Sequence, residues 1–120
     1  MTKKEITGIR DLTFSSWVRE NLPDSSTGYM ASDLDFIFWN YKTKKVMLIE
    51  IKTRSANVKT WQKIMWSNID KWIRKGIDSD WTYLGFNVIQ FERTTFEDGR
   101  CYLNGNEISE LELIQVLNLS

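Results

Sequence analysis

The chain has 120 residues, a formal net charge of zero, one cysteine and no histidine. This length suits a single domain, and a composition that is 42% hydrophobic and 13% aromatic is typical of a globular protein rather than a disordered one. The lone cysteine excludes an internal disulfide, and the lack of histidine excludes the usual zinc sites and Ser-His or Cys-His nucleophiles. Any hydrolysis must therefore use carboxylates, lysine and metal.

The N-terminal part predicts a helix, a turn and a short strand. A helix is expected over 11–21, with either Asp11 or Thr13 as its N-cap. Its predicted buried stripe consists of Phe14, Trp17 and Val18. Pro23 and the polar residues after it end this helix. A brief strand is expected at 29–31.

The segment 32–54 contains two apolar runs with charged residues at alternating positions. Because strand side chains alternate between faces, each run presents one mixed apolar and charged face. These faces comprise Asp33, Asp35, Ile37 and Trp39 in the first run, and Val46, Leu48, Glu50 and Lys52 in the second. The short polar connection at 40–45 favours two neighbouring antiparallel strands. If the strands pair, the acids and the lysine lie side by side.

A long amphipathic helix is expected next, roughly over 57–75, with Gly76 as a stop signal. Its apolar residues recur at helical spacing and are expected to pack on the sheet. They are Val58, Trp61, Ile64, Met65, Ile69, Trp72 and Ile73. Tryptophans on such stripes, including Trp17, Trp61 and Trp72, are more often core residues than platforms for bases. Trp39, which shares a face with Asp35, is the better candidate for base stacking.

The C-terminal third predicts a strand at 83–91, a turn at 97–99, a hairpin of 100–103 with 106–108, and a last helix that ends at 117. Ser109 is the expected cap of this helix. The predicted order of elements is therefore α, β, β, β, α, β, followed by a hairpin and a helix.

Charge is unevenly distributed along the chain. Residues 42–75 carry ten basic residues against two acidic ones, and the part after them is mainly acidic. A basic segment beside an acid cluster favours a polyanionic partner. A solvated helix face would explain the same charges, so their distribution alone does not decide between the two interpretations.

The pattern of Asp35 at the start of one strand and Glu50-Ile51-Lys52 on the next, between two helices, resembles the PD-(D/E)xK nuclease superfamily. The resemblance implies the α/β restriction-endonuclease-like fold, with an α-β-β-β-α-β core and a mixed central sheet flanked by helices. It covers about 11–92 and leaves the hairpin and helix of 93–120 as an addition within a single domain of 1–120.

Within this superfamily the chain is similar to small Holliday-junction-resolvase-like or phage-type nucleases, which are short and often homodimeric. The resemblance therefore implies a homodimer whose partner is DNA. Together with the lack of any ~20-residue apolar stretch or signal-like segment, it leads us to expect an intracellular, cytoplasmic protein without membrane association. By analogy, a phage gene expressed in a bacterial host fits a nuclease of this size.

The resemblance implies that Asp35 and Glu50 bind Mg²⁺ or Mn²⁺, with the backbone carbonyl of Ile51 as a further ligand and Lys52 as the catalytic lysine. These residue types suit the reaction, because Mg²⁺ prefers oxygen ligands and a lysine can orient the attacking water and offset phosphate charge. A Glu-x-Lys on a strand is most often an exposed ion pair. Here it lies at the end of the apolar run 46–51, where unpartnered charge is costly and function explains it better.

Three further residues are weaker candidates for the site. Asp33 is a second candidate for the aspartate, and no proline directly precedes Asp35, although proline is often absent in the superfamily. Taken singly, either aspartate is about equally well explained as an acid at a turn or strand start. Glu20 and Gln62 match positions where some members supply another acid or a glutamine, and their plain interpretation is a solvent-facing acid and a surface amide.

The predicted function is metal-dependent hydrolysis of DNA phosphodiester bonds. The enzyme could select its substrate by DNA structure, and the sequence does not distinguish DNA from RNA as the substrate. The residues expected to contact the nucleic-acid backbone are Arg54, Lys59, Gln62, Lys63 and Lys71. Two alternatives remain open. The chain could be an inactive nuclease-fold module that binds or inhibits, or a protein-interaction partner that uses its acidic C-terminal half.

Overall fold

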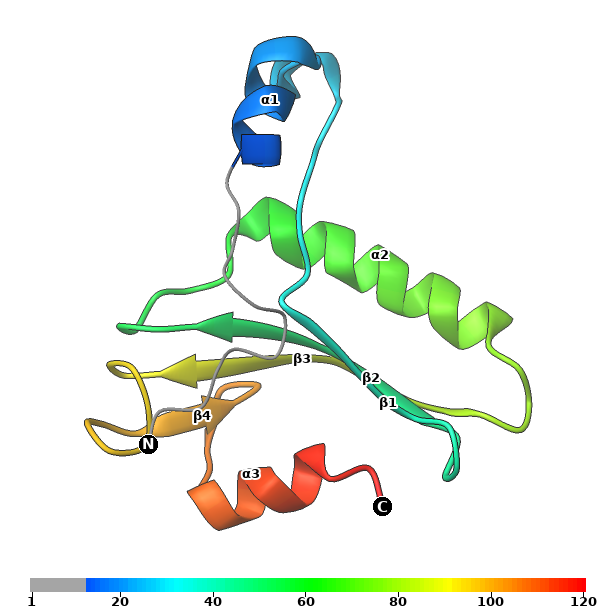
Figure 1. The fold of residues 1–120 in the computed structure, drawn as a ribbon, viewed down its shortest axis with the longest axis vertical. Coiled ribbons are helices and arrows are strands. Elements are labelled where there is room, and N and C mark those ends of the chain that lie inside the picture. The colour runs from blue at the N-terminus through cyan, green and yellow to red at the C-terminus, as the bar shows by residue number, and fades with distance from the viewer. Residues whose placement is uncertain (1–12) are drawn as a thin grey trace. The chain divides into compact units, whose positions relative to one another are not determined.

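The computed structural model describes residues 13–120, which fall into two compact units, 13–32 and 33–120 (Figure 1). The larger one contains a five-stranded sheet with helices, so the chain is a mixed α/β protein. No helix among the described residues is long and apolar enough to cross a membrane.

The smaller unit contains helix α1 (Thr13–Asn21) and a single 3-10 turn, η1 (Ser25–Thr27). The Asp24 side chain caps the turn by accepting a hydrogen bond from the backbone N–H of Ser26 at 3.0 Å. Gly28 then leaves the turn with a left-handed φ of 91°. Of the two predicted N-caps of α1, Thr13 is already helical and Asp11 lies outside the described residues.

Two predictions for the smaller unit are wrong. The apolar stripe of α1 is not buried, since Phe14 is 70% exposed and Trp17 is 49% exposed, and these two rings stack on each other instead. A nine-residue helix within a unit of this size has too little partner surface to cover a stripe. The predicted strand at 29–31 is irregular, because three residues gain too few ladder hydrogen bonds to offset their ordering.

The sheet of the larger unit has the strand order β1-β2-β3-β4-β5. The β1–β2, β3–β4 and β4–β5 pairs are antiparallel, and β2–β3 is parallel. Helix α2 (Thr60–Gly76) makes the crossover that a parallel pair requires. The strands are β1 (Phe36–Asn40), β2 (Lys45–Lys52), β3 (Thr82–Phe91), β4 (Cys101–Leu103) and β5 (Asn106–Glu107).

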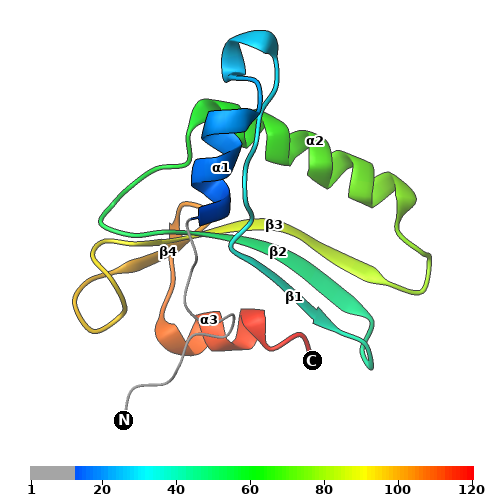
Figure 2. The same cartoon turned by 45° about the horizontal axis from the view of Figure 1, so that its top comes forward.

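Helices α2 and α3 (Glu110–Leu117) lie on opposite faces of the sheet (Figures 1 and 2). Alternate residues of β2 therefore enter two different clusters. Met47 and Ile49 pack with α3 residues such as Leu113, whereas Leu48 packs with Trp66 of α2. Because β2 is covered on both faces, its long apolar run suits a central strand.

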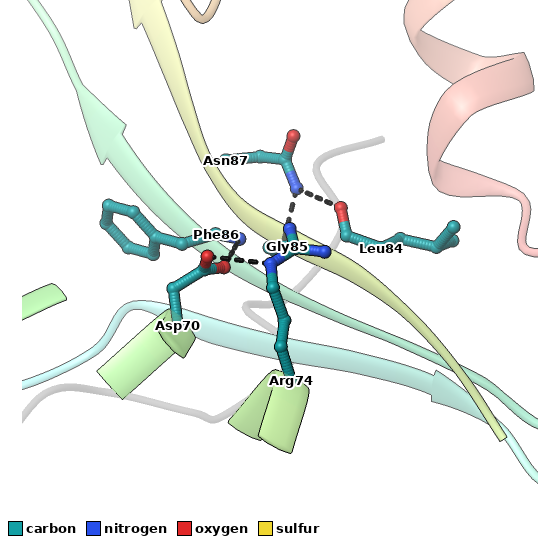
Figure 3. Close-up of polar contacts among 6 residues, drawn as sticks. All are labelled: Asp70, Arg74, Leu84, Gly85, Phe86 and Asn87. Atoms are coloured by element: carbon teal, nitrogen blue, oxygen red, sulfur yellow. Dashed lines mark hydrogen bonds and ion pairs between the residues drawn. The ribbon is translucent and has the colours of Figure 1, made fainter. Parts of the chain in front are cut away.

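Helix α2 is attached to an irregular part of β3 by a polar contact (Figure 3). Asp70 accepts a hydrogen bond from the backbone N–H of Phe86 at 3.2 Å and forms an ion pair with Arg74 at 2.9 Å. The neighbouring Gly85 has a φ of 88°, and a Cβ there would lie 3.0 Å from Nη2 of Arg74. The left-handed φ therefore favours glycine at this bend in β3, and a side chain there would also require the Arg74 guanidinium to shift.

The predicted C-terminal hairpin and last helix are confirmed. The hairpin turns at Asn104 and Gly105, both of which have positive φ. The side chain of Ser109 accepts a hydrogen bond from the N–H of Glu112, whose carboxylate accepts one from the N–H of Ser109, so α3 begins with a capping box. The observed order is α, β, β, α, β, β, β, α, which has one strand fewer before the long helix than predicted.

The long helix was predicted in the right place, but its buried stripe was partly wrong. Ile64 and Trp72 are 61% and 62% exposed, while Trp66, which was not assigned to the stripe, is 6% exposed. Trp66 stacks on Phe86 of β3 with ring centroids 4.8 Å apart. The sheet therefore meets a face of α2 that is rotated from the one that the apolar spacing favoured.

Candidate active site

The predicted acids and lysine converge at one end of the β1–β2 pair. The antiparallel pairing is confirmed, and its register sets Phe36 opposite Ile49. Asp35 is one residue before Phe36 and Glu50 one residue after Ile49, so the ladder directs these two residues toward each other. Asp33 and Asp35 lie just before the strand rather than in it, because β1 begins at Phe36.

Glu50 is a buried charged residue in the central strand β2, with 6% of its surface exposed. Its Oε1 atom lies 3.7 Å from Nζ of Lys52, which is on the same strand face. When Glu50 is ionised, its buried Oε2 atom has no hydrogen-bond donor among the described residues. A buried carboxylate oxygen without a partner is costly, and such groups are rare in native structures unless a proton, water or ion completes them.

The surroundings of Glu50 oppose its negative charge. Burial raises its pKa to about 7, and hydrogen bonding to the Asp35 carboxyl group and repulsion from its charge act in the same direction. Lys52 lowers this pKa, and Asp33 raises it. Two neighbouring carboxyl groups must therefore share a proton or bind a cation when one of them is buried.

Asp35 has a structural partner as well. Its Oδ2 atom accepts a hydrogen bond from the backbone N–H of Ile51 at 2.8 Å. Because β2 continues to Lys52 while β1 begins only at Phe36, this N–H lies beyond the paired part of β1. The carboxylate takes the place of a strand carbonyl there, which fixes its position beside Glu50.

The remaining candidate ligands are less closely associated with this pair. Asp33 is close enough for its charge to affect Glu50, and it makes other interactions of its own. Glu20 is on α1 in the separate unit 13–32 and is exposed. Within the described part of the chain, no group of three or more His, Cys, Asp and Glu side chains is arranged to hold a metal ion.

The donor set of Asp35 and Glu50 fits Mg²⁺ or Mn²⁺. Both carboxyl groups offer hard oxygen atoms, and Mg²⁺ is usually held by one or two carboxylates while water and substrate phosphates complete its coordination. The fit rests on the unpartnered Oε2 atom of Glu50, which a cation would satisfy. Lys52, whose Nζ lies 3.7 Å from Oε1 of Glu50, would then stand beside the bound ion.

The predicted nucleic-acid contacts occupy different environments. Lys59, Lys63 and Lys71 are exposed on or beside α2. Gln62 is half-buried, and its Oε1 atom accepts a hydrogen bond from the backbone N–H of Lys59 at 3.3 Å. This amide thus has a structural role at the start of the helix.

Arg54 lines a pocket of about 610 Å³ together with Arg93, a residue that sequence reasoning did not single out. The available signal was that each arginine follows the carboxyl end of a strand, β2 or β3, by two residues. These strand ends meet only because β2 and β3 are parallel neighbours.

Comparisons with known proteins add one distant relative. The chain is 29% identical over 91 residues to an uncharacterized protein of Archaeoglobus fulgidus, an alignment that covers 75% of this chain and 60% of the archaeal protein. The matched region thus spans less than two thirds of the relative's length. No family model matches the chain, and no solved structure matches it.

Proposed function

We propose that this chain is a metal-dependent DNA endonuclease that hydrolyses phosphodiester bonds with Mg²⁺ or Mn²⁺. The main support is the pairing of Asp35 with the buried Glu50, whose Oε2 atom has no donor among the described residues. A nearby lysine adds the cation that phosphate chemistry requires. The proposal includes a restriction-endonuclease-like arrangement of the core.

Each of the three residues has a distinct role in this proposal. Asp35 and Glu50 would hold the metal ion, with the backbone carbonyl of Ile51 as a further oxygen ligand. When bound, the ion lowers the pKa of a water molecule and stabilises negative charge on the phosphate. The ammonium of Lys52 orients the attacking water and offsets the phosphate charge. Its contact with Oε1 of Glu50 keeps the ammonium beside the reacting group.

The proposed substrate contacts extend from this site along the basic part of the chain. Lys59, Lys63 and Lys71 are exposed and can approach phosphates without reading bases. We further propose that the active species is a homodimer. The edge strand β1 supports this, because its Ile37 and Trp39 are exposed large apolar residues.

The test is cleavage of labelled single-stranded, duplex, flap and four-way-junction DNA in Mg²⁺, Mn²⁺ or EDTA. Glu50→Gln and Lys52→Ala should each reduce the rate by at least about 100-fold, because each removes a group that acts on the transition state. Glu107→Gln, which neutralises an exposed acid on β5, is the matched control and should cleave like the wild type. Sedimentation analysis with and without DNA measures the oligomeric state.

Metal binding has a readout that is independent of turnover. Mn²⁺ should raise the melting temperature of the wild type and have much less effect on Glu50→Gln, because a ligand stabilises only the state that binds it. DNA binding without cleavage in either metal would favour the inactive module. Neither cleavage nor DNA binding at low salt would favour the protein-interaction partner instead.

A further inference from the structure

Arg54 lines a pocket and follows Lys52 of the proposed active site by two residues. The pocket measures about 610 Å³ and is lined by Arg54, Ser55, Glu92, Arg93, Thr94 and Asp98. These residues follow the carboxyl ends of the parallel strands β2 and β3. Open α/β sheets commonly bind ligands at this edge.

Backbone hydrogen bonds hold the two arginine segments together. The N–H of Arg54 donates to the carbonyl of Arg93 at 2.8 Å, and the N–H of Ser55 donates to the carbonyl of Phe91 at 3.1 Å. Arg54 and Ser55 both have left-handed φ values, 55° and 57°. Non-glycine residues adopt this conformation at an energetic cost, and such residues are concentrated at functional sites.

The two acidic side chains of the pocket already accept hydrogen bonds from backbone N–H groups of the surrounding loop. Asp98 accepts hydrogen bonds from the backbone N–H groups of Thr94 and Thr95, both at 3.0 Å. Oε1 of Glu92 accepts one from the backbone N–H of Arg100 at 3.0 Å. These carboxylates therefore stabilise the loop 92–100 and are not used to neutralise the arginines.

The two guanidinium groups, in contrast, have no partner in the described part of the chain. Salt bridges there involve Arg74 and Arg100 but neither Arg54 nor Arg93, and no side-chain hydrogen bond is formed by these two residues. Each guanidinium carries five N–H donors in a planar fork that matches phosphate oxygens. Two guanidinium groups without partners that line one pocket are suited to bind an oxyanion.

We propose that Arg54 and Arg93 bind a phosphodiester of the nucleic-acid backbone, on the same strand as the bond that is cleaved and a few nucleotides from it. The distance from the cleaved bond rests on the proposed function. Arg54 follows Lys52 by two residues, so their Cα atoms are at most ~7 Å apart. Both side chains are several ångströms long, so the phosphate that the arginines bind is expected within a few nucleotides of the cleaved bond.

The charge of the pocket favours an internal phosphodiester over a terminal phosphate. Glu92 and Asp98 line the same surface as the arginines. With two positive and two negative side chains in the lining, the second negative charge of a terminal phosphate gains little net attraction over the single charge of a diester. The ligand is therefore a continuous strand, which agrees with cleavage inside a chain rather than at its end.

The first test is DNA binding by fluorescence anisotropy in EDTA, where cleavage cannot interfere. Arg54→Gln and Arg93→Gln should each weaken binding about threefold to tenfold and reduce the slope of log K against log salt by about one. Arg93→Lys should keep the salt slope and lose part of the affinity, because it retains the charge and not the fork. Lys75→Gln, an exposed basic residue at the end of α2, should do neither.

The second test locates the phosphate. A set of oligonucleotides is prepared, each with one neutral methylphosphonate linkage at a different position. The affinity of the protein for each oligonucleotide is then measured. The wild type should lose affinity when the neutral linkage stands at one position within a few nucleotides of its cut. The Arg54→Gln/Arg93→Gln double variant should show no such loss at that position. Adding a terminal phosphate should leave the affinity of the wild type unchanged.

The outcomes separate this inference from the proposed function. If both glutamine variants bind with the affinity and salt slope of the wild type, the phosphate site is wrong even though the wild type cleaves DNA. If the wild type cleaves nothing, yet both variants lose affinity, the phosphate site stands and the nuclease proposal fails. Circular dichroism and melting temperature establish that each variant is folded.

Discussion

Glu50 is the residue whose proposed function most clearly lowers the stability of the fold. A glutamate in the central strand of a sheet is disfavoured on energetic grounds, and Lys52 at 3.7 Å compensates only one of its oxygen atoms. A well-packed apolar residue would serve the sheet better. A protein that retains a carboxylate here gains something other than stability, and a bound cation is the gain that we propose.

This conflict predicts a pH-dependent stability in the absence of metal. The folded-state pKa of Glu50 is about 7 against an ordinary value of 4.5, so between these values the folded chain binds more protons than the unfolded one. Stability contributed at this site is present below about pH 4.5 and is lost as the pH rises to about 7. Glu50→Gln should remove this loss, because the amide is neutral and can donate to Asp35.

Urea denaturation at pH 5 and pH 8 in EDTA measures the effect. At pH 8 the variant should be more stable than the wild type by roughly 1–3 kcal/mol, from 1.36 kcal/mol per pKa unit. At pH 5 the difference should be much smaller. Equal stabilities of the two proteins at pH 8 would contradict the prediction, and Glu107→Gln controls for the loss of a single exposed charge.

At the scale of elements, helix α2 shows how packing overrides periodicity. Its apolar residues outnumber the positions that one face of a helix can bury, so several stripes are compatible with the sequence. The contact with β3 selects the stripe that contains Trp66, through its stacking on Phe86 and the nearby attachment of Asp70 to β3. Trp72 remains on the outer part of the helix.

Two tryptophans of α2 therefore provide a matched pair of substitutions. Trp66→Ala should destabilise the fold by about 3–5 kcal/mol, because it removes a large buried side chain that packs with Leu48 and Phe86. Trp72→Ala should change stability by less than about 1 kcal/mol, because its side chain is 62% exposed. Denaturant unfolding of both variants tests this, and a larger effect at Trp72 would indicate that the buried face is wrongly assigned.

For the whole molecule, the larger unit contains the hydrophobic core of the described residues. Both core clusters are formed by residues from Leu34 onward, and the proposed ligands Asp35 and Glu50 belong to the same unit. Only Glu20, the weakest candidate ligand, lies in the smaller unit. The division thus separates the candidate site from a helix whose residues make no buried core.

A chain that begins at residue 33 should fold and bind metal. We expect cooperative unfolding of the truncated protein and a rise in its melting temperature with Mn²⁺ equal to that of the full chain. The reason is that its core and both proposed ligands are retained. A folded truncated protein without any response to Mn²⁺ would assign a ligand to the removed part, and Glu20→Gln in the full chain would then show whether it is Glu20.

Local signals account for most of what could be predicted. The period-two alternation through Glu50 and Lys52, the turn residues Asn104 and Gly105, and the cap at Ser109 each act over a few residues, and each is found as predicted. The strand predicted at 29–31 is not formed, because a strand depends on more than local signals. Its local pattern is adequate, but a strand needs a partner that the sequence does not specify.

The sequence by itself determined the mixed α/β character, the antiparallel β1–β2 pair and the common face of Glu50 and Lys52, because backbone geometry sets these over short distances. Only the tertiary structure decided that Glu50 is buried with an unpartnered oxygen, and that Arg54 and Arg93 line one pocket. Burial and neighbourhood depend on which surfaces meet, and here they depend on the parallel pairing of β2 with β3 across a helix.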